Sequence, residues 1–260
     1  MIRLDLYLNE FGFTKSRQKA KILIESGCVY VNSQKISKPS HLVNEEEIID
    51  VKIINDCPYV SRGGLKLEKV LNDMKYDLQN KIALDIGAST GGFTDCLLKH
   101  GAKLVYAVDS GVNQLDESLI DNEKVISIEK YNARNISFDL IGECVDIITI
   151  DVSFISQTLI LPAAIKLLKP EGAYISLIKP QFEAGKDKIG KGGIVKKSKD
   201  RFLGVKKVLD SAIDQGLSCI YFSASPILGG DGNIEFLAVF SKNGSKSIDE
   251  SEIKKIVLEN

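Results

Sequence analysis

Two lysines and an aspartate stand in short polar segments that could support proton transfer. Lys66 lies in Ser61-Arg-Gly-Gly-Leu-Lys-Leu67, Asp151 opens Asp151-Val-Ser-Phe154, and Lys179 opens Lys179-Pro-Gln-Phe-Glu183. Asp151 and Lys179 each follow an apolar run, which places each at the end of an expected strand. A lysine that is partly desolvated and near a second lysine has a lowered pKa and can act as a general base. The alternative for any one of these lysines is an ordinary surface salt bridge.

A glycine-rich turn follows the first long apolar run of the second part of the chain. Its sequence is Asp85-Ile-Gly-Ala-Ser-Thr-Gly-Gly-Phe-Thr94, and it opens a helical pattern. The spacing is neither GxGxxG nor a Walker A motif. Glycines allow a sharp turn and a close approach to a ligand, and amide N–H groups at a helix start could face a carboxylate or phosphate. The alternative is a tight turn without a ligand.

Two acids accompany this turn. Asp85 ends its strand and could bind an ammonium group, and Asp109 ends the next strand 24 residues later. A ribose-binding acid stands at that second place in doubly wound folds. An acid for an ammonium group, together with amides for a carboxylate, suits the amino-acid tail of S-adenosylmethionine better than a pyrophosphate. A Rossmann dehydrogenase is the rival from this motif alone, and a plain turn residue is the alternative for Asp109.

The elements that would position these residues alternate regularly from about residue 59 onward. Apolar runs separated by helical patterns predict parallel strands covered by helices on both faces. The runs are residues 82–86, 104–108, 125–128, 145–150 and 173–178. Two further runs, 217–222 and 234–240, lack a helix between them and predict an antiparallel pair at the edge of the sheet. The expected fold class is therefore α/β, with a Rossmann-like, mostly parallel sheet and an antiparallel last strand.

The first 58 residues differ in pattern and predict a small, separate α+β domain. A first helix carries Leu4 and Leu8 on one face, and a second helix, capped by Thr14 or Ser16, stops at Gly27. The strands expected after the helices are residues 29–31 and 48–54, with a turn at residues 32–35. Domains of residues 1–58 and 59–260 are expected, because the proline after Cys57 favours a non-helical connector.

Charge is unevenly distributed along the chain. The whole chain has a net charge of -1, so it is not a generic polycation. Residues 1–40 nevertheless hold seven Lys or Arg against three acids, and residues 41–60 hold one Lys against five acids. Any affinity for nucleic acid must therefore come from local basic patches.

Composition argues against several other classes of protein. The five cysteines include no CxxC pair, which argues against a disulfide framework and against a zinc ribbon. Two histidines offer little for histidine-based chemistry. The start has no apolar signal region, and no window approaches ~18 consecutive apolar residues. We expect a soluble cytoplasmic protein with no metal and no membrane partner.

Seven motifs, in order along nearly the whole chain, carry a family resemblance. They are Arg3-Leu-Asp with Ser16-Arg17 and Ala20, Tyr59-Val-Ser-Arg-Gly-Gly-Leu-Lys66-Leu, the Asp85 turn, Tyr106-Ala-Val-Asp109-Ser-Gly, Asp151-Val-Ser-Phe-Ile-Ser, Ile178-Lys179-Pro-Gln-Phe-Glu, and Ser225-Pro-Ile-Leu-Gly-Gly-Asp-Gly-Asn-Ile-Glu235-Phe. On these motifs the chain resembles the TlyA family, also called haemolysin A, of S4-domain ribosomal RNA 2′-O-methyltransferases. The second domain is similar to FtsJ/RrmJ-type ribose methyltransferases.

The resemblance implies a catalytic tetrad that falls on Lys66, Asp151, Lys179 and Glu235. The implied reaction is in-line transfer of a methyl group from S-adenosylmethionine to a ribose 2′-hydroxyl. Lys179, held neutral by burial and by Lys66, would take the hydroxyl proton, and Asp151 would orient Lys179. Lys66 and Glu235 would hold the surroundings of the hydroxyl.

The same resemblance implies a cofactor pocket around the glycine turn. Its expected residues are Asp85, Gly87, Ser89, Thr90, Gly91, Gly92, Phe93, Thr94, Asp109 and Asn132. Asp109 would bind the ribose hydroxyls, and Asn132 would contact the edge of the adenine. The turn has Ala88-Ser89 where FtsJ-type enzymes more often have Ala-Pro, and both pairs allow the turn.

An S4-type module binds structured RNA through basic residues on helices and through shape. The residues expected to bind RNA are Arg3, Lys15, Arg17, Lys19, Lys21, Arg62, Lys186, Lys188 and Lys191. The last three lie within Gly185–Gly193, a glycine-rich stretch that suggests a mobile loop beside Lys179, able to grip phosphates and to order on binding. The alternative for the helix residues is a solvated helix face.

The implied function is that of a ribosomal RNA (cytidine-2′-O)-methyltransferase whose partner is ribosomal RNA or a ribosomal subunit, with the protein a monomer or weak dimer. A membrane-active cytolysin is the first alternative, suggested by the older family name. An RNA-binding protein without catalysis is the second. No signal peptide or long apolar segment supports the first alternative, and the complete tetrad and glycine turn argue against the second.

Overall fold

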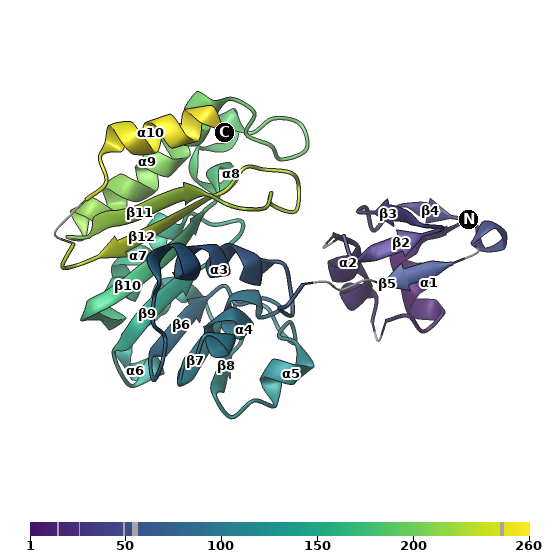
Figure 1. Cartoon of the computed structure of the whole chain (residues 1–260), viewed down its shortest axis with the longest axis horizontal. Coiled ribbons are helices and arrows are strands. Elements are labelled where there is room, and N and C mark those ends of the chain that lie inside the picture. The colour runs from purple at the N-terminus through teal and green to yellow at the C-terminus, as the bar shows by residue number, and fades with distance from the viewer. Residues whose placement is uncertain (15, 26, 49, 54–56, 245–246) are drawn as a thin grey trace. The chain divides into compact units, whose positions relative to one another are not determined.

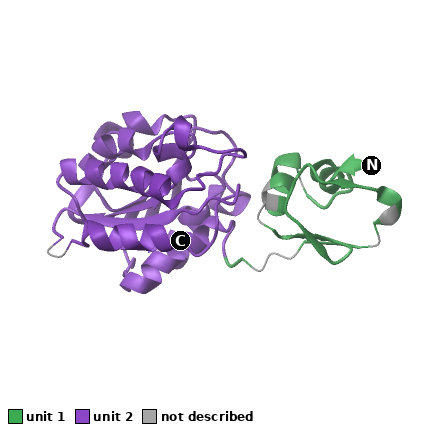
Figure 2. Cartoon of the chain, turned by 90° about the horizontal axis from the view of Figure 1, so that it is seen from above, with its two compact units in different colours: residues 1–58 green, residues 59–260 purple. Residues whose placement is uncertain are grey.

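The computed structural model describes residues 1–260 except residues 15, 26, 49, 54–56 and 245–246. The chain divides into two compact units, Met1–Pro58 and Tyr59–Asn260, which Figure 2 shows in green and purple. Each unit has its own buried apolar cluster, so each is described by itself.

The smaller unit combines two helices with short antiparallel strands. Its elements are β1 (Ile2–Arg3), α1 (Leu4–Glu10), α2 (Arg17–Glu25), β2 (Val29–Val31), β3 (Gln34–Ile36), β4 (Leu42–Val43), the 3₁₀ turn η1 (Glu45–Glu47) and β5 (Val51–Ile53). The strands form a sheet in the order β3-β2-β5 and a separate pair, β1 with β4. Ser16 caps α2, because its Oγ accepts a hydrogen bond from the backbone N–H of Lys19 at 3.2 Å.

The core of this unit explains the spacing of the apolar residues in its helices. Leu4, Leu8, Ala20 and Ile24 from the two helices are fully buried and belong to one cluster with the strand residue Val29. The strands differ in detail from those expected. The turn is confined to residues 32–33, and β3 already begins at Gln34. The described part of the expected strand at 48–54 is strand only at Val51–Ile53.

The larger unit alternates strands and helices along the chain (Figure 1). Its first half contains α3 (Gly63–Met74), β6 (Ile82–Ile86), α4 (Gly92–Lys99), β7 (Leu104–Val108), α5 (Glu117–Ile120), β8 (Val125–Ile128), η2 (Ala133–Asn135), α6 (Phe138–Ile141) and β9 (Val145–Ile150). Its second half contains η3 (Gln157–Leu159), α7 (Leu161–Ala164), η4 (Ile165–Leu167), β10 (Leu168–Ile178), α8 (Pro180–Glu183), η5 (Lys186–Lys188), α9 (Ser198–Asp214), β11 (Ser218–Ala224), β12 (Phe236–Ser241) and α10 (Glu250–Glu259).

The seven-stranded sheet of this unit has the order β11-β12-β10-β9-β6-β7-β8. Strands β6 to β10 pair in parallel, and β12 runs antiparallel to both β10 and β11. Helices lie on both sides of the sheet (Figure 2). The Rossmann-like fold with an antiparallel last strand is therefore confirmed. The chain runs from β6 towards β8 and then returns to β9 on the other side of β6, which creates the switch point where such sheets bind ligands.

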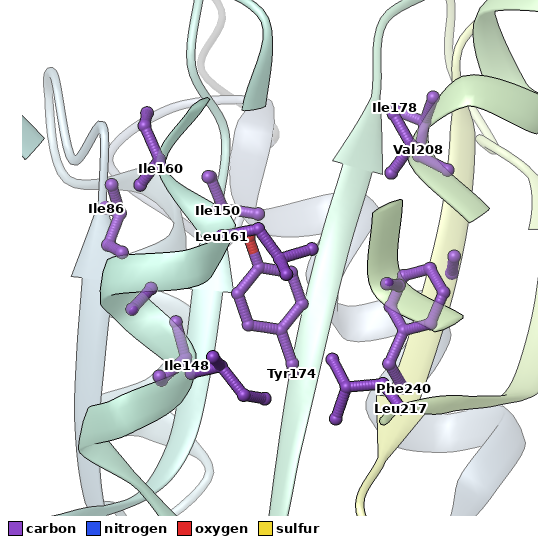
Figure 3. Close-up of a cluster of buried hydrophobic side chains, with 14 of the residues drawn as sticks. Ile86, Ile148, Ile150, Ile160, Leu161, Tyr174, Ile178, Val208, Leu217 and Phe240 are labelled. Carbon is purple, nitrogen blue, oxygen red and sulfur yellow. The ribbon is translucent and has the colours of Figure 1, made fainter. Parts of the chain in front are cut away.

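Large apolar side chains fill one face of the sheet. Ile86, Ile150, Tyr174 and Phe240 are completely buried, and Figure 3 shows Leu161 of α7 beside Ile150 and the ring of Tyr174. Burying each such side chain contributes roughly 1.5–3 kcal/mol. The near-continuous apolar runs of the sequence are explained by this burial, since strands covered on both faces have no solvent side.

The hydroxyl of Tyr174 generates a stability prediction. It is buried and has no hydrogen-bond partner in the described part of the chain. An unpaired buried polar group costs about 1–3 kcal/mol, so Tyr174→Phe should raise the free energy of unfolding by about 1 kcal/mol. Tyr106 is the matched control, because its hydroxyl donates to Glu143 at 2.9 Å. Tyr106→Phe should instead lower that free energy. Denaturant unfolding measures both, and a loss of stability in Tyr174→Phe would contradict the reading.

Candidate active site

The carboxyl ends of β6, β7, β9 and β10 lie at one edge of the sheet, because these strands are parallel. The loops after β6 and β9 touch through their backbones at this edge. The N–H of Asp151 donates to the carbonyl oxygen of Ile86 at 2.9 Å. Gly87 has φ +83, and a Cβ on it would lie 2.4 Å from the carbonyl oxygen of Asp151. A glycine is therefore required where the turn passes the loop that carries Asp151.

The glycine turn also supports the segment that leads into α3. Gly91 has φ +91 and precedes α4 directly. A Cβ on Gly92 would lie 2.2 Å from Oγ of Ser61 and 3.0 Å from the backbone nitrogen of Gly64. Asp95 in the first turn of α4 accepts a hydrogen bond from the N–H of Val60 at 2.9 Å. These contacts hold the start of α3 against the turn, and α3 carries Lys66.

Within the chain, the side chain of Asp85 binds two threonine hydroxyls. Its side chain is completely buried, and its two oxygens accept hydrogen bonds from the hydroxyls of Thr94 (2.7 Å) and Thr149 (2.8 Å). Burial raises the pKa of Asp85 to about 6, although both hydroxyls act in the opposite direction. This geometry favours a role in fixing α4 and the turn to β6 and β9.

Asp109 lies at the end of β7, half-buried. One of its oxygens accepts from the N–H of Ser89 at 2.8 Å, and the other accepts from the N–H of Gly111 at 2.7 Å. A small, partly open cavity adjoins it, lined by Ala88, Ser89, Ala107, Asp109, Gly111, Gln114, Leu115, Ser127 and Glu129. Gln114 and Glu129 were not predicted, because only the fold brings their loops to this place.

The other residues expected to bind the cofactor differ in burial and in the elements that carry them. Phe93 is buried within α4, and the carbonyl of Thr90 accepts from the N–H of Asp116 at 3.2 Å. Asn132 caps η2, where its side-chain oxygen accepts from the N–H of Arg134 at 3.1 Å. Its side chain is exposed and is not among those that line the cavity beside Asp109.

Four ionisable side chains from distant parts of the sequence converge at the same edge of the sheet. Nζ of Lys66 lies 2.6 Å from Oε2 of Glu235, a residue 169 positions later in the chain. Nζ of Lys179 lies 2.5 Å from Oδ1 of Asp151. Charge–charge effects cross between the pairs, because Lys66 lowers the pKa of Asp151 and Glu235 raises the pKa of Lys179. The structure thus brings together all four residues of the expected tetrad.

The expected lowering of the pKa of Lys179 is wrong for the chain as the structure shows it. Burial lowers this pKa, but the attraction of Asp151 and Glu235 outweighs burial, so the pKa of Lys179 is raised. Burial likewise raises the pKa of Asp151, but Lys179 and Lys66 outweigh it, so that pKa is lowered. Both members of the pair are therefore charged at neutral pH. The sequence suggested the neighbouring lysine but did not reveal how close the carboxylates lie.

Hydrogen bonds outside the tetrad fix the loops that carry it. Nζ of Lys179 also donates to Oγ of Ser153 at 2.9 Å, and Nε2 of Gln181 donates to Glu235 at 3.2 Å. Glu183 is buried and accepts from Oγ of Ser156 (2.5 Å) and from the N–H of Gln157 (2.8 Å). Glu183 therefore joins α8 to the loop that follows β9. No role for Glu183 was predicted.

Phe154 is an aromatic residue at the tip of the loop after β9. Its side chain is 92% exposed, and its backbone has φ +64, a conformation unfavourable for a non-glycine residue. Its ring is tilted against that of Phe182, with centroids 5.1 Å apart. Phe154 directly follows Ser153 and lies three residues after Asp151, and both of these residues contact Lys179. Strained backbone of this kind clusters at functional sites and ligand clamps.

The basic residues expected to bind RNA occur in both units. Arg3 and Arg17 both contact Asp5, Lys21 is exposed on α2 together with half-buried Lys19, and Lys15 lies outside the described residues. In the larger unit, Arg62 directly precedes α3 and is half-buried.

The remaining three basic residues belong to the stretch after α8. Lys186 and Lys188 form the turn η5, Lys188 pairs with Asp187 at 3.0 Å, and Lys191 is exposed. Hydrogen bonds hold the end of this stretch. The side chain of buried Asn233 accepts from the N–H of Val195 at 3.1 Å and donates to the carbonyl of Gly193 at 3.0 Å. Asn233 thus ties this stretch to the segment that leads to Glu235.

The fold and the site define a Rossmann-like methyltransferase. Residues 59–242 match the family of FtsJ-like methyltransferases, and residues 2–49 match the S4 domain. The chain therefore belongs to the FtsJ-like methyltransferase family and carries an S4 domain at its N-terminus. Both parts of the resemblance drawn from the sequence are confirmed.

Three similar proteins illustrate the relationship. The chain is 44% identical to "Hemolysin A" of Brachyspira hyodysenteriae over 92% of this chain and 99% of that protein. It is 37% identical to the 16S/23S rRNA (cytidine-2′-O)-methyltransferase TlyA of Mycobacterium tuberculosis, over 90% of this chain and 87% of that protein. A solved structure named as a hemolysin of Streptococcus thermophilus is 41% identical, with a TM-score of 0.78 over 99% of this chain and 94% of that one.

Among the described residues, no helix is long and apolar enough to cross a membrane. The same residues contain no group of three or more His, Cys, Asp or Glu side chains arranged to hold a metal ion. The comparisons support methyl transfer over the membrane-active alternative, because the matching family covers most of the larger unit.

The backbone contact at Gly87 generates a prediction with a matched control. Gly142 has the same φ of +83 but would have no atom within 4 Å of an added Cβ. Both Gly87→Ala and Gly142→Ala should lose about 1 kcal/mol of stability to the left-handed backbone. Only Gly87→Ala should also weaken binding of S-adenosylmethionine, the methyl donor proposed below, by at least tenfold, because its Cβ meets backbone that no side-chain movement can relieve. Calorimetric titration checks this, and equal cofactor affinity in the two variants would refute it.

Proposed function

We propose that the chain methylates ribose 2′-hydroxyls of ribosomal RNA, with S-adenosylmethionine as the methyl donor. The observation that carries the proposal is the convergence of Lys66, Asp151, Lys179 and Glu235 at the sheet edge that also holds the glycine turn. Relatives named as cytidine-2′-O-methyltransferases of ribosomal RNA support cytidine as the target. Such a substrate makes the cytoplasm the expected place of action.

The residues of the turn fit a nucleoside-bearing methyl donor. Gly87, Gly91 and Gly92 let the turn pack closely against the neighbouring segments of the chain, and the half-buried carboxylate of Asp109 borders a small cavity. We assign the turn to the methionine end of the donor and Asp109 to the ribose hydroxyls. When bound, S-adenosylmethionine supplies a methyl group activated by a sulfonium centre. The N-terminal unit (residues 1–58) serves RNA binding, and residues 59–260 serve cofactor binding and catalysis.

The lysine pairs provide the proton transfer that this reaction needs. A ribose hydroxyl is a poor nucleophile until its proton is removed, and Nζ of Lys179 is assigned as the acceptor of that proton. Asp151 positions Lys179 through their 2.5 Å contact. The buried pair of Lys66 with Glu235, supported by Gln181, holds the surroundings in place. Alignment of the methyl group with the hydroxyl oxygen supplies much of the remaining rate.

The raised pKa of Lys179 generates a prediction for the pH dependence. Lys179 accepts a proton only in its neutral form, and its raised pKa keeps it protonated at neutral pH. The rate of methyl transfer should therefore rise with pH through the neutral and alkaline range. Asp151→Asn removes the ion pair, so it should move this rise to lower pH while reducing the maximal rate. Initial rates with labelled S-adenosylmethionine and ribosomal subunits measure both profiles.

Two lysine variants complete that test. Lys179→Met keeps the length of the side chain but removes the amine, and it should reduce kcat by roughly 10²–10⁴. Lys207→Met is the control, since Lys207 lies 3.6 Å from Glu183 yet is half exposed and outside the tetrad. It should retain the wild-type rate within about twofold. A pH-independent rate, or full activity in Lys179→Met, would exclude Lys179 as the base.

RNA binding by the larger unit is assigned to the stretch after α8 and to Phe154. Lys186 and Lys191 are exposed, and Asn233 ties this stretch to the chain just before Glu235. The exposed ring of Phe154 offers a face on which an unstacked base can lie, as aromatic side chains do in recognition of single-stranded RNA. Phosphate contacts would thus flank the four ionisable residues.

Charge reversal in this stretch is the corresponding test. The triple change Lys186→Glu, Lys188→Glu and Lys191→Glu should weaken RNA binding and reduce the slope of log affinity against log salt, by about 0.7–0.9 for each lost phosphate contact. Lys255→Glu on α10 is the control, and it should leave the slope unchanged. Filter binding to ribosomal subunits at several salt concentrations gives both values. An unchanged slope in the triple variant would rule out this stretch as a phosphate contact.

A further inference from the structure

The N-terminal unit contains one carboxylate that binds two arginines at once. The side chain of Asp5 is completely buried. Its Oδ1 accepts from Nε of Arg3 at 2.9 Å, and its Oδ2 accepts from Nη2 of Arg3 at 3.1 Å and from Nε of Arg17 at 2.9 Å. Arg3 directly precedes α1, and Arg17 opens α2. One buried acid therefore fixes two guanidinium groups that come from different elements.

The two arginines keep much of their surface open to solvent. Their side chains are 39% and 46% exposed. A guanidinium has five N–H donors, and the bonds to Asp5 use two of those of Arg3 and one of those of Arg17. The cluster carries a net charge of +1, because the two arginines lower the pKa of Asp5 to about 2 against the effect of its burial. Asp5 thus lowers the charge of this surface while ordering it.

The remaining donors suit a phosphate oxygen. Arginine binds phosphate in a planar, bidentate geometry, and two guanidinium groups that share one carboxylate are held near each other. An arginine that is already fixed loses less side-chain freedom on binding than a free one. Two arginines held in this way should bind a phosphate more tightly than two mobile side chains of the same charge.

We infer that Asp5 is a positioning residue for RNA binding, which holds Arg3 and Arg17 as a preformed fork for a phosphate of the RNA backbone. The inference rests on the proposed function, since it takes ribosomal RNA as the ligand. It assigns a role to a buried acidic residue that lies beneath a surface proposed to bind a polyanion. By charge alone, Asp5 opposes that binding.

Because the charge of Asp5 and its positioning role act in opposite directions, the direction of the change in RNA affinity on replacing Asp5 decides between them. Asp5→Asn preserves the shape of the side chain and raises the net charge of the unit by one. If Asp5 acted only through its charge, the variant would bind RNA more tightly. If Asp5 positions the arginines, the variant should bind roughly tenfold more weakly. Full-length protein and purified ribosomal subunits are used, with filter binding as the measurement and thermal unfolding to show that the variant is folded.

Charge-preserving variants separate positioning from a purely structural ion pair. Arg3→Lys and Arg17→Lys keep the charge and an ion pair with Asp5 but lose the planar fork. Each should raise both Kd and KM for the subunits several-fold, with kcat and the salt slope unchanged. A merely structural ion pair would leave Kd and KM at their wild-type values. These variants also carry the test if Asp5→Asn proves unfolded.

Asp50→Asn is the matched control in the same unit. The side chain of Asp50 pairs with Lys52 at 3.0 Å and is 41% exposed. This variant should bind within about twofold of wild type or slightly more tightly. If folded Asp5→Asn bound RNA as tightly as wild type or more tightly, this inference would be overturned and the proposed function would stand. The same holds if Kd were unchanged in both Arg3→Lys and Arg17→Lys. Failure of the wild-type chain to bind either subunit would overturn the proposed function and this inference with it.

Discussion

The parallel pairing of β9 with its two neighbours is the constraint on which the site depends. Ile150 at the end of β9 pairs with Ile86 of β6 on one side and with Ser176 of β10 on the other. Asp151 follows Ile150 directly, the glycine turn follows Ile86, and Lys179 follows the end of β10. The loops after β6 and β9 therefore leave the sheet at the same level, and β10 continues for two residues beyond Ser176 before it reaches Lys179. The backbone contact between Gly87 and Asp151 and the ion pair between Asp151 and Lys179 follow from this register.

The ion pairs stabilise the protonated form of Lys179, which opposes its proposed role as a base. Asp151 and Glu235 favour the ammonium form of Lys179, whereas a general base must be neutral. Burial acts in the other direction, so the balance depends on which charges are present at this edge of the sheet. A further positive charge brought close to Lys179 would disfavour its protonated form. In the proposed reaction, Lys179 would therefore lose its proton more readily with the positively charged methyl donor bound than in the free chain.

The sequence predicted the larger unit well, because strands buried on both faces leave long apolar runs that end in polar residues. Lys66, Asp151, Lys179 and Glu235 could be named because each stands in a recognisable motif. The sign of the pKa shift of Lys179 could not be predicted, since it depends on a distance to Asp151 that only the fold determines.

Other features left weak signals or none. The hydrogen bond from Thr149 to Asp85 was missed because Thr149 lies 64 residues away on another strand. Strands β1 and β4 are two residues each, too short to show an alternating pattern. The exposure of Phe154 could not be predicted either, because an aromatic residue after a strand ordinarily indicates a buried core position.

The cost of burying charge explains why function, and not stability, is the better account of the four ionisable residues. Lys66, Glu235, Asp151 and Lys179 all lie largely out of solvent. Taking a charged pair out of water costs several kcal/mol per ion, and well-packed apolar residues of similar volume are often as stable or more so. The hydrogen bonds that Lys179 donates to Ser153 and that Gln181 donates to Glu235 offset only part of that cost. A fold selected for stability alone would fill this edge of the sheet with apolar side chains, as it fills the faces of the same strands.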